Sequence, residues 1–266
     1  MSRRDAILRE MGLAPLWRLR SPSHAQDMDA TPDYGIHLEC DAADRTVEMA
    51  TPSPAPTPPV PSVFIAPGTA ASGDWPTLLA EIAACRACAL AGHRKQAVPG
   101  VGDQQADWLF VGEGPGAEED ERGEPFVGQA GRLLDNMLAA IGLARGQDVY
   151  IANAVKCRPP HNRTPEADEI AACHGFLDRQ ILLIAPRLIV ALGRPAAQSL
   201  LDREVKIAGS RGRLFHRGEV PVIITYHPAY LLRNPHDKAK AWEDLCFARS
   251  TMAALKAAAG TTPSSD

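Results

Sequence analysis

The chain has 266 residues, of which 45% are hydrophobic and 5% aromatic, and a formal net charge of −4. This length suits one large domain or two small ones with a real hydrophobic core, and the negative charge argues against a general nucleic-acid binder. The charge is uneven, because residues 1–76 hold 6 Lys and Arg against 10 Asp and Glu while the remainder is neutral. A neutral domain can still present one basic face.

Apolar runs of the length that spans a bilayer are missing, and the first residues lack an apolar signal-peptide core. We therefore expect a cytoplasmic protein without membrane association, and a monomer. Six cysteines in a reducing compartment are expected to be metal ligands or plain thiols rather than disulfides.

The N-terminal part divides into two segments. Residues 1–20 place apolar groups at helical spacing up to Met11, after which Gly12 and Pro15 end the pattern. This short amphipathic helix could bind a protein partner, although packing on its own domain is the more ordinary use. Residues 21–73 are rich in Pro, Ala, Ser and Thr and are predicted to be a disordered linker.

Residues 74–258 are predicted to form one folded domain, followed by a disordered tail over 259–266. The predicted helices are a segment capped by Asp74 that runs through Cys88 to near Gly92, then Gln129–Leu143, a helix starting at Thr164-Pro165-Glu166 and ending near Ile184, Pro195–Leu201, and Asp237–Lys256. The predicted strands are residues 107–111, Val149–Ala152, Arg187–Gly193 and Val220–Thr225.

The alternation of these strands and helices predicts an α/β fold: a three-layer α/β/α sandwich with a mostly parallel central sheet. Loops that leave the parallel strands gather at one edge of such a sheet, which is where open α/β folds bind ligands. Residues more than a hundred positions apart can therefore share one pocket.

A glycine-rich loop, Gly112-Glu113-Gly114-Pro115-Gly116, directly follows the first strand. Read alone it could be an ordinary tight turn, but glycines also let backbone lie directly against a flat ligand. A lysine does not follow the glycines as in a phosphate-binding loop, which disfavours a nucleotide-binding enzyme.

Several further motifs follow in order along the chain. They are Gly123-Glu124-Pro125-Phe126-Val127-Gly128, Asn153 at the end of the second strand, His227-Pro228-Ala229-Tyr230-Leu231-Leu232-Arg233 after the last strand, and the cysteines Cys85, Cys88, Cys157 and Cys173. Together with the glycine loop, this set resembles the family 4 uracil-DNA glycosylases, which carry an iron-sulfur cluster. The resemblance covers roughly residues 75 to 257.

The resemblance implies a monofunctional glycosylase that removes uracil from single- or double-stranded DNA, leaves an abasic site and acts in base excision repair. The alternative is a non-catalytic DNA-binding or damage-sensing module on the same scaffold. A related branch that traps DNA covalently carries a long basic insertion and prefers glutamine where this chain has Gly114. Since both features are missing here, turnover is expected.

The resemblance also implies roles for the base-binding residues. Phe126 is expected to stack on uracil and Asn153 to read its edge, although read alone these would be a core ring and a strand-end cap. His227 would hydrogen-bond uracil O2 as negative charge builds on the base. Glu113 would position the attacking water or orient the substrate.

Other residues are expected to assist at the pocket and on the DNA. Gly112, Gly114 and Gly116 would contribute backbone to substrate binding, and the acidic pair Glu119 and Asp120 would support the loop or form a solvated helix start. Leu231 or Leu232 would wedge into the gap that the flipped base leaves, and Arg233 would meet a phosphate. Ala229 replaces the serine that the family carries there.

Four cysteines form a candidate metal site: Cys85, Cys88, Cys157 and Cys173. By count, four thiolates suit zinc and an iron-sulfur cluster equally well, and the resemblance favours a [4Fe-4S] cluster. The site is expected to be structural, and Cys246 is expected to be a core residue.

Overall fold

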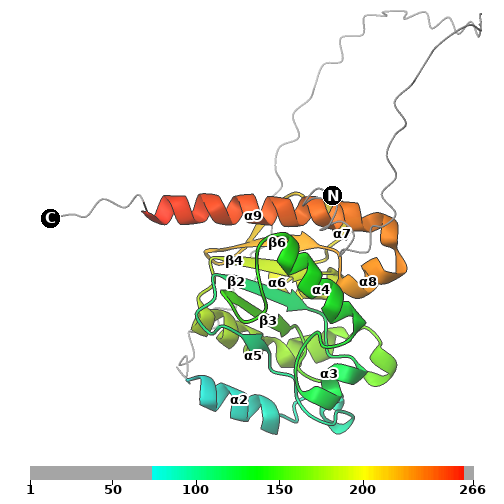
Figure 1. The fold of residues 1–266 in the computed structure, drawn as a ribbon. Coiled ribbons are helices and arrows are strands. Elements are labelled where there is room, and N and C mark those ends of the chain that lie inside the picture. Colours follow the sequence, from blue (N-terminus) through cyan, green and yellow to red (C-terminus); the bar gives the residue numbers. More distant parts are fainter. Residues whose placement is uncertain (1–73, 261–266) are drawn as a thin grey trace, which may run out of the picture. The chain divides into compact units, whose positions relative to one another are not determined.

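The computed structural model describes residues 74–260. The predicted N-terminal helix, the linker and all but the first two residues of the predicted tail lie outside this range. Element labels follow Figure 1.

A six-stranded sheet in the order β1-β3-β2-β4-β6-β5 forms the middle of the fold (Figure 1). The strands are β1 (Val101–Gly102), β2 (Trp108–Gly112), β3 (Val149–Asn153), β4 (Leu188–Leu192), β5 (Leu214–Arg217) and β6 (Val220–Thr225). The four central strands pair in parallel, whereas β1 and β5 pair antiparallel at the two edges. The predicted mostly parallel sheet is confirmed. The two edge strands are short or half-exposed, so they lack the apolar runs that revealed the central ones.

Helices cover both faces of the sheet. They are α2 (Trp75–Ala84), α3 (Ala117–Arg122), α4 (Gln129–Ala140), α5 (Ala167–Ile184), α6 (Arg194–Leu201), α7 (Ile207–Ser210), α8 (Pro228–Arg233) and α9 (Lys238–Gly260), with 3-10 turns at Ala89–Gly92, Pro160–Asn162 and Pro235–Asp237. None of the helices within residues 74–260 is long and apolar enough to cross a membrane.

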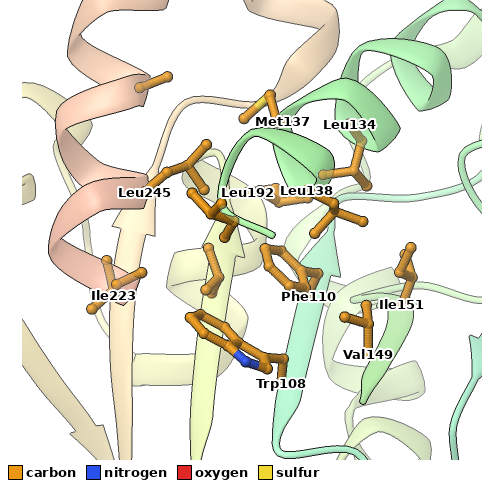
Figure 2. Packing of buried hydrophobic residues seen from close by; sticks show 14 of the residues in the cluster. Trp108, Phe110, Leu134, Met137, Leu138, Val149, Ile151, Leu192, Ile223 and Leu245 are labelled. Atoms are coloured by element: carbon orange, nitrogen blue, oxygen red, sulfur yellow. The ribbon is translucent and has the colours of Figure 1, made fainter. Parts of the chain in front are cut away.

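The side chains of β2 point alternately to the two faces of the sheet, so the hydrophobic core has two parts. Trp108 and Phe110 pack with residues of α4 and α9 on one face, as Figure 2 shows, while Leu109 and Val111 pack with α5 and α6 on the other. Successive side chains of a strand point to opposite faces, so an entirely apolar strand needs helices on both sides. This confirms the three-layer α/β arrangement.

Several predicted helix boundaries were wrong, and the helix predicted over Gln129–Leu143 ends at Ala140. The first helix stops at Ala84 instead of continuing past Cys88, so Cys85 and Cys88 lie in the turn after it. The helix expected to start at Thr164-Pro165-Glu166 begins at Ala167, because Glu166 is the capping residue and Glu169 completes a capping box. The last helix continues to Gly260, into the predicted tail.

Candidate active site

A cavity of about 900 Å³ opens where the parallel strands end. Its lining brings together residues from four separated loops, including Glu113, Gly114, Gly116, Phe126, Asn153, His227 and Arg233. The volume exceeds what one pyrimidine base needs and falls in the range of pockets for larger ligands. Most of the predicted site residues therefore share one pocket, as the parallel topology requires.

Asn153 ends β3 and is only 1% exposed. Its side-chain oxygen Oδ1 is buried and has no hydrogen-bond partner among the described residues. Buried polar atoms are nearly always paired in folded proteins, so an unpaired oxygen on a residue of the pocket lining marks Asn153 as a candidate ligand-binding residue.

Gly112 stands beside Asn153 in the sheet and does not line the cavity itself. A Cβ placed on Gly112 would lie 2.4 Å from Asn153 Oδ1 and 2.5 Å from the Phe126 ring. The missing side chain is what allows the amide and the ring to meet behind the pocket.

Phe126 is 6% exposed and has a positive φ of 56°, a strained conformation for a residue with a bulky side chain. Its ring centroid lies 5.4 Å from that of His227. Arg145 donates hydrogen bonds to the carbonyls of Pro125 (2.9 Å) and Phe126 (2.8 Å) and is itself paired with Asp135 on α4. The strained loop is therefore held from behind by a guanidinium.

His227 caps the N-terminus of α8, and its Nδ1 accepts a hydrogen bond of 3.1 Å from the Ala229 backbone N–H. Burial and the positive charge of Arg233 lower the pKa of His227 to about 4, although Glu119 acts in the opposite direction. The ring is consequently neutral at pH 7. Since Nδ1 is an acceptor, the ring proton sits on Nε2, which becomes the donor.

Glu113 lies half-buried in the pocket lining. Burial raises its pKa, while a side-chain hydrogen bond with Thr164 and the charges of Arg194 and Arg233 oppose the rise. Glu113 therefore has two nearby cations and one hydroxyl that can orient its carboxyl group.

Glu119 connects the glycine loop with the Phe126 loop. Its Oε2 accepts from the Gly116 N–H (3.1 Å), and its Oε1 accepts from the N–H groups of Val127 (2.9 Å) and Gly128 (3.1 Å). Asp120 is 2% exposed and accepts from the Lys95 N–H. Glu119 and Asp120 therefore accept hydrogen bonds from neighbouring loops and do not form a fully solvated helix start.

The two leucines of the last motif differ in exposure. Leu231 is 1% exposed and belongs to the hydrophobic core, whereas Leu232 is 41% exposed and Arg233 is exposed beside it. Leu231 faces inward on α8, so Leu232 is the more exposed candidate for the predicted wedge.

The four cysteines Cys85, Cys88, Cys157 and Cys173 are all free thiols. Burial and the charges of Cys173 and Cys88 raise the pKa of Cys157 to about 11, although Arg94 acts in the opposite direction. Cys173 is affected in the same way by burial and by the charges of Cys88 and Cys85. The four sulfurs are thus near enough to interact.

Within residues 74–260, no three side chains of Cys, His, Asp or Glu are grouped tightly enough to hold a single metal ion. Four thiols whose charges affect one another remain a candidate site for zinc or for an iron-sulfur cluster. Cys246 lies apart on α9 and is half-buried, less enclosed than the expected core residue.

Several residues at these sites were not identified from the sequence. They are Arg94, whose Nη1 lies 2.9 Å from Cys157 Sγ, Arg145, Lys156, Thr164 and Arg194. The sequence signal that could have found one of them is the position of Lys156, a lone charge in the apolar run between Asn153 and Cys157.

A mostly parallel sheet with a pocket at the carboxyl ends of its central strands, lined by a neutral histidine and an amide with an unpaired oxygen, is the ligand-binding arrangement of an open α/β fold. Residues 99–246 match the family model described as the uracil DNA glycosylase superfamily. The match covers more than half of the chain.

Curated relatives narrow the assignment. The chain is 48% identical over 166 residues to a type-4 uracil-DNA glycosylase of Archaeoglobus fulgidus, covering 59% of this chain and 83% of the relative. It is 48% identical over 170 residues to that of Thermotoga maritima, covering 62% and 88%. A type-5 uracil-DNA glycosylase of Pyrobaculum aerophilum is 36% identical over 154 residues, covering 50% and 66%. This chain belongs to the type-4 uracil-DNA glycosylases of the superfamily.

Proposed function

We propose that Glu113, Asn153 and His227 carry out the reaction of a uracil-DNA glycosylase in this protein. The enzyme is a hydrolase of N-glycosyl bonds that releases uracil from DNA in base excision repair. Its product is an abasic site. Residues 74–258 form the glycosylase domain, and the substrate is uracil-containing DNA.

The observation that carries the residue assignment is the buried, unpaired Oδ1 of Asn153. An enzyme that acts on a base in duplex DNA must take it out of the stack. Uracil in the pocket presents an N3–H donor to Oδ1 and an O4 acceptor to the Asn153 amide nitrogen. Cytosine presents the opposite pattern and would leave the buried amide mismatched, which such sites reject strongly.

The Phe126 ring stacks on the extruded base, and Gly114 and Gly116 allow the backbone to approach it. Because the ring is fixed by a strained backbone and by Arg145, little ordering cost remains when the base enters.

His227 stabilises the departing base. Its Nε2–H donates to uracil O2 as the glycosidic bond breaks and negative charge builds on the base, an interaction stronger in the transition state than in the ground state. A neutral donor suits this task, and its tautomer is set by the Ala229 N–H.

Glu113 orients the attacking water. A carboxylate held by Thr164, Arg194 and Arg233 has a fixed direction and can accept a hydrogen bond from that water. On the DNA, Leu232 fills the gap that the flipped nucleotide leaves, and Arg233 contacts a phosphate.

Cys85, Cys88, Cys157 and Cys173 hold a [4Fe-4S] cluster with a structural role. The four free thiols, whose charges affect one another, and the membership of a family that typically carries such a cluster support this assignment. The cluster would join the turn after α2 to the segment after β3 and to α5, which stabilises the region that follows Asn153.

The test of the proposed function is release of uracil from an oligonucleotide with a single uracil, followed by alkaline cleavage at the abasic site. Asn153→Ala and His227→Ala are each expected to lower the single-turnover rate by about 100-fold or more, as for lost transition-state donors. Asn162→Ala, at the exposed rim of the same pocket, serves as the control. An intact strand with the wild-type protein would instead indicate a non-catalytic DNA-binding module.

A further inference from the structure

Lys156 is a buried cation that the proposed reaction does not use. It is 1% exposed, follows Asn153 by three residues and directly precedes Cys157. Its Nζ donates to the Asn153 backbone carbonyl (2.7 Å) and to Gln180 Oε1 (2.6 Å). The ammonium group therefore lies between the end of β3 and Gln180 on α5.

The partners of Lys156 are themselves fixed. Gln180 on α5 is fully buried, and its Nε2 donates to the Pro99 carbonyl (2.7 Å). The Lys156 backbone N–H lies 3.3 Å from Cys173 Sγ, which is on the same helix as Gln180. One residue thus contacts both the carbonyl of the base-reading asparagine and a proposed cluster ligand.

The charge of Lys156 lacks an ordinary counter-ion. Among the described residues, no carboxylate forms an ion pair with it, and the hydrogen-bond acceptors at its Nζ are uncharged. Isolated buried charges are costly, so they are usually compensated. Negative charge can come from the adjoining cysteines, because Cys157 follows Lys156 directly and Cys173 Sγ lies 3.3 Å from the Lys156 backbone nitrogen. Arg94 likewise donates to Cys157 Sγ. A cluster bound by four thiolates carries net negative charge.

We propose that Lys156 is a positioning residue that couples the cluster to the uracil pocket, because its ammonium compensates the cluster's negative charge and holds the Asn153 carbonyl. This inference rests on the proposed function, since it takes the cluster and the base-reading role of Asn153 from there. The end of β3 is then correctly placed only when the charged lysine and the cluster are both present.

The experiment compares Lys156→Met with the wild type in two measurements. One is the midpoint reduction potential of the bound cluster, and the other is the dissociation constant for an oligonucleotide with a non-cleavable uracil nucleotide. Methionine keeps the length of the side chain but removes the charge and both donated bonds. The expected result is a lower potential, because a nearby cation favours the reduced cluster, together with about 10- to 100-fold weaker binding, as for other residues that orient ligands.

Gln180→Met separates the two effects. It keeps the ammonium but removes its side-chain acceptor, so uracil-DNA binding is expected to weaken while the potential stays near that of the wild type. Lys256→Met is the matched control, because Lys256 on α9 is 47% exposed and pairs with Asp107. It should change neither quantity.

Wild-type values of both quantities in Lys156→Met would overturn the coupling. If Lys156→Met does not fold, wild-type binding by a folded Gln180→Met would overturn it instead. A wild-type protein without iron or without uracil release would contradict the proposed function, and that outcome is visible before any variant is made.

Discussion

His227 shows how much of the chemistry depends on the surroundings of one side chain. In the unfolded chain its pKa is the ordinary 6.5, whereas burial lowers the pKa to about 4 in the folded protein. Between these values the unfolded state binds more protons than the native state. This residue's contribution to stability is therefore fully present above pH 6.5 and is lost as the pH falls towards 4.

The first prediction concerns this pH dependence. Urea unfolding of the wild type should show lower stability at pH 5 than at pH 7.5. His227→Gln should show a smaller difference, because glutamine does not titrate. The same slope in both proteins would mean that His227 is not kept neutral by its surroundings. The wild-type kcat should likewise fall on the acidic side only below pH 6.5.

Gly112 gives a second prediction at the residue scale. Gly112→Ala places a methyl group 2.4 Å from Asn153 Oδ1 and against the Phe126 ring, so it should destabilise the fold by about 1–3 kcal/mol and weaken binding of uracil-DNA. The measurements are urea unfolding and a binding titration. Gly175→Ala on α5 is the control, since a Cβ there meets nothing within 4 Å; it should be neutral or slightly stabilising.

At the scale of elements, one carboxylate joins two loops. Glu119 on the short helix α3 accepts three backbone N–H groups, one from the glycine loop and two from the segment after Phe126. Neither loop has regular structure of its own. Their relative placement depends strongly on this residue.

The third prediction is that Glu119→Ala lowers the unfolding free energy by about 2–3 kcal/mol, since buried N–H groups lose a charged acceptor. It should also reduce uracil release, because the Phe126 loop loses its attachment. Glu118→Ala is the control one residue away. The Glu118 carboxylate is 53% exposed, and its ion pair with Arg122 is long, at 3.9 Å. Exposed pairs of this kind contribute less than about 1 kcal/mol. Equal effects of the two changes would argue against the attachment.

At the scale of the whole molecule, the proposed cluster connects parts that are distant in sequence. The turn that carries Cys85 and Cys88 precedes the sheet, whereas Cys157 follows β3 and Cys173 lies on α5. Burial raises the thiol pKa of Cys157 to about 11, so without a metal this thiol stays protonated and provides no strong link.

The fourth prediction is that anaerobically purified protein is brown with broad absorbance near about 400 nm, as expected of the cluster chemistry, and that a chelator removes the colour and lowers the melting temperature. Cys157→Ser should bind less iron. Cys246→Ser should bind as much as the wild type because Cys246 lies apart from the four thiols. Stoichiometric zinc without iron would reject the cluster.

The sequence by itself determined the fold class and the candidate residues of the site. Apolar runs of four or five residues mark the central strands, the glycine loop and Asn153 follow such runs directly, and His227 comes two residues after the last strand. Each of these signals lies within a few neighbouring residues, so it can be recognised from the sequence alone. Parallel topology then places the loops at one edge.

Only the tertiary structure decided which of these side chains line the pocket and which are buried in the core. It assigned Leu231 to the core and Leu232 to the surface, placed the proton of His227 on Nε2, and showed that Lys156 lies buried between Asn153 and the cysteines. Burial, tautomer and hydrogen-bond partner are set by atoms from distant segments that meet only in the folded chain. A pattern of neighbouring residues does not contain that information.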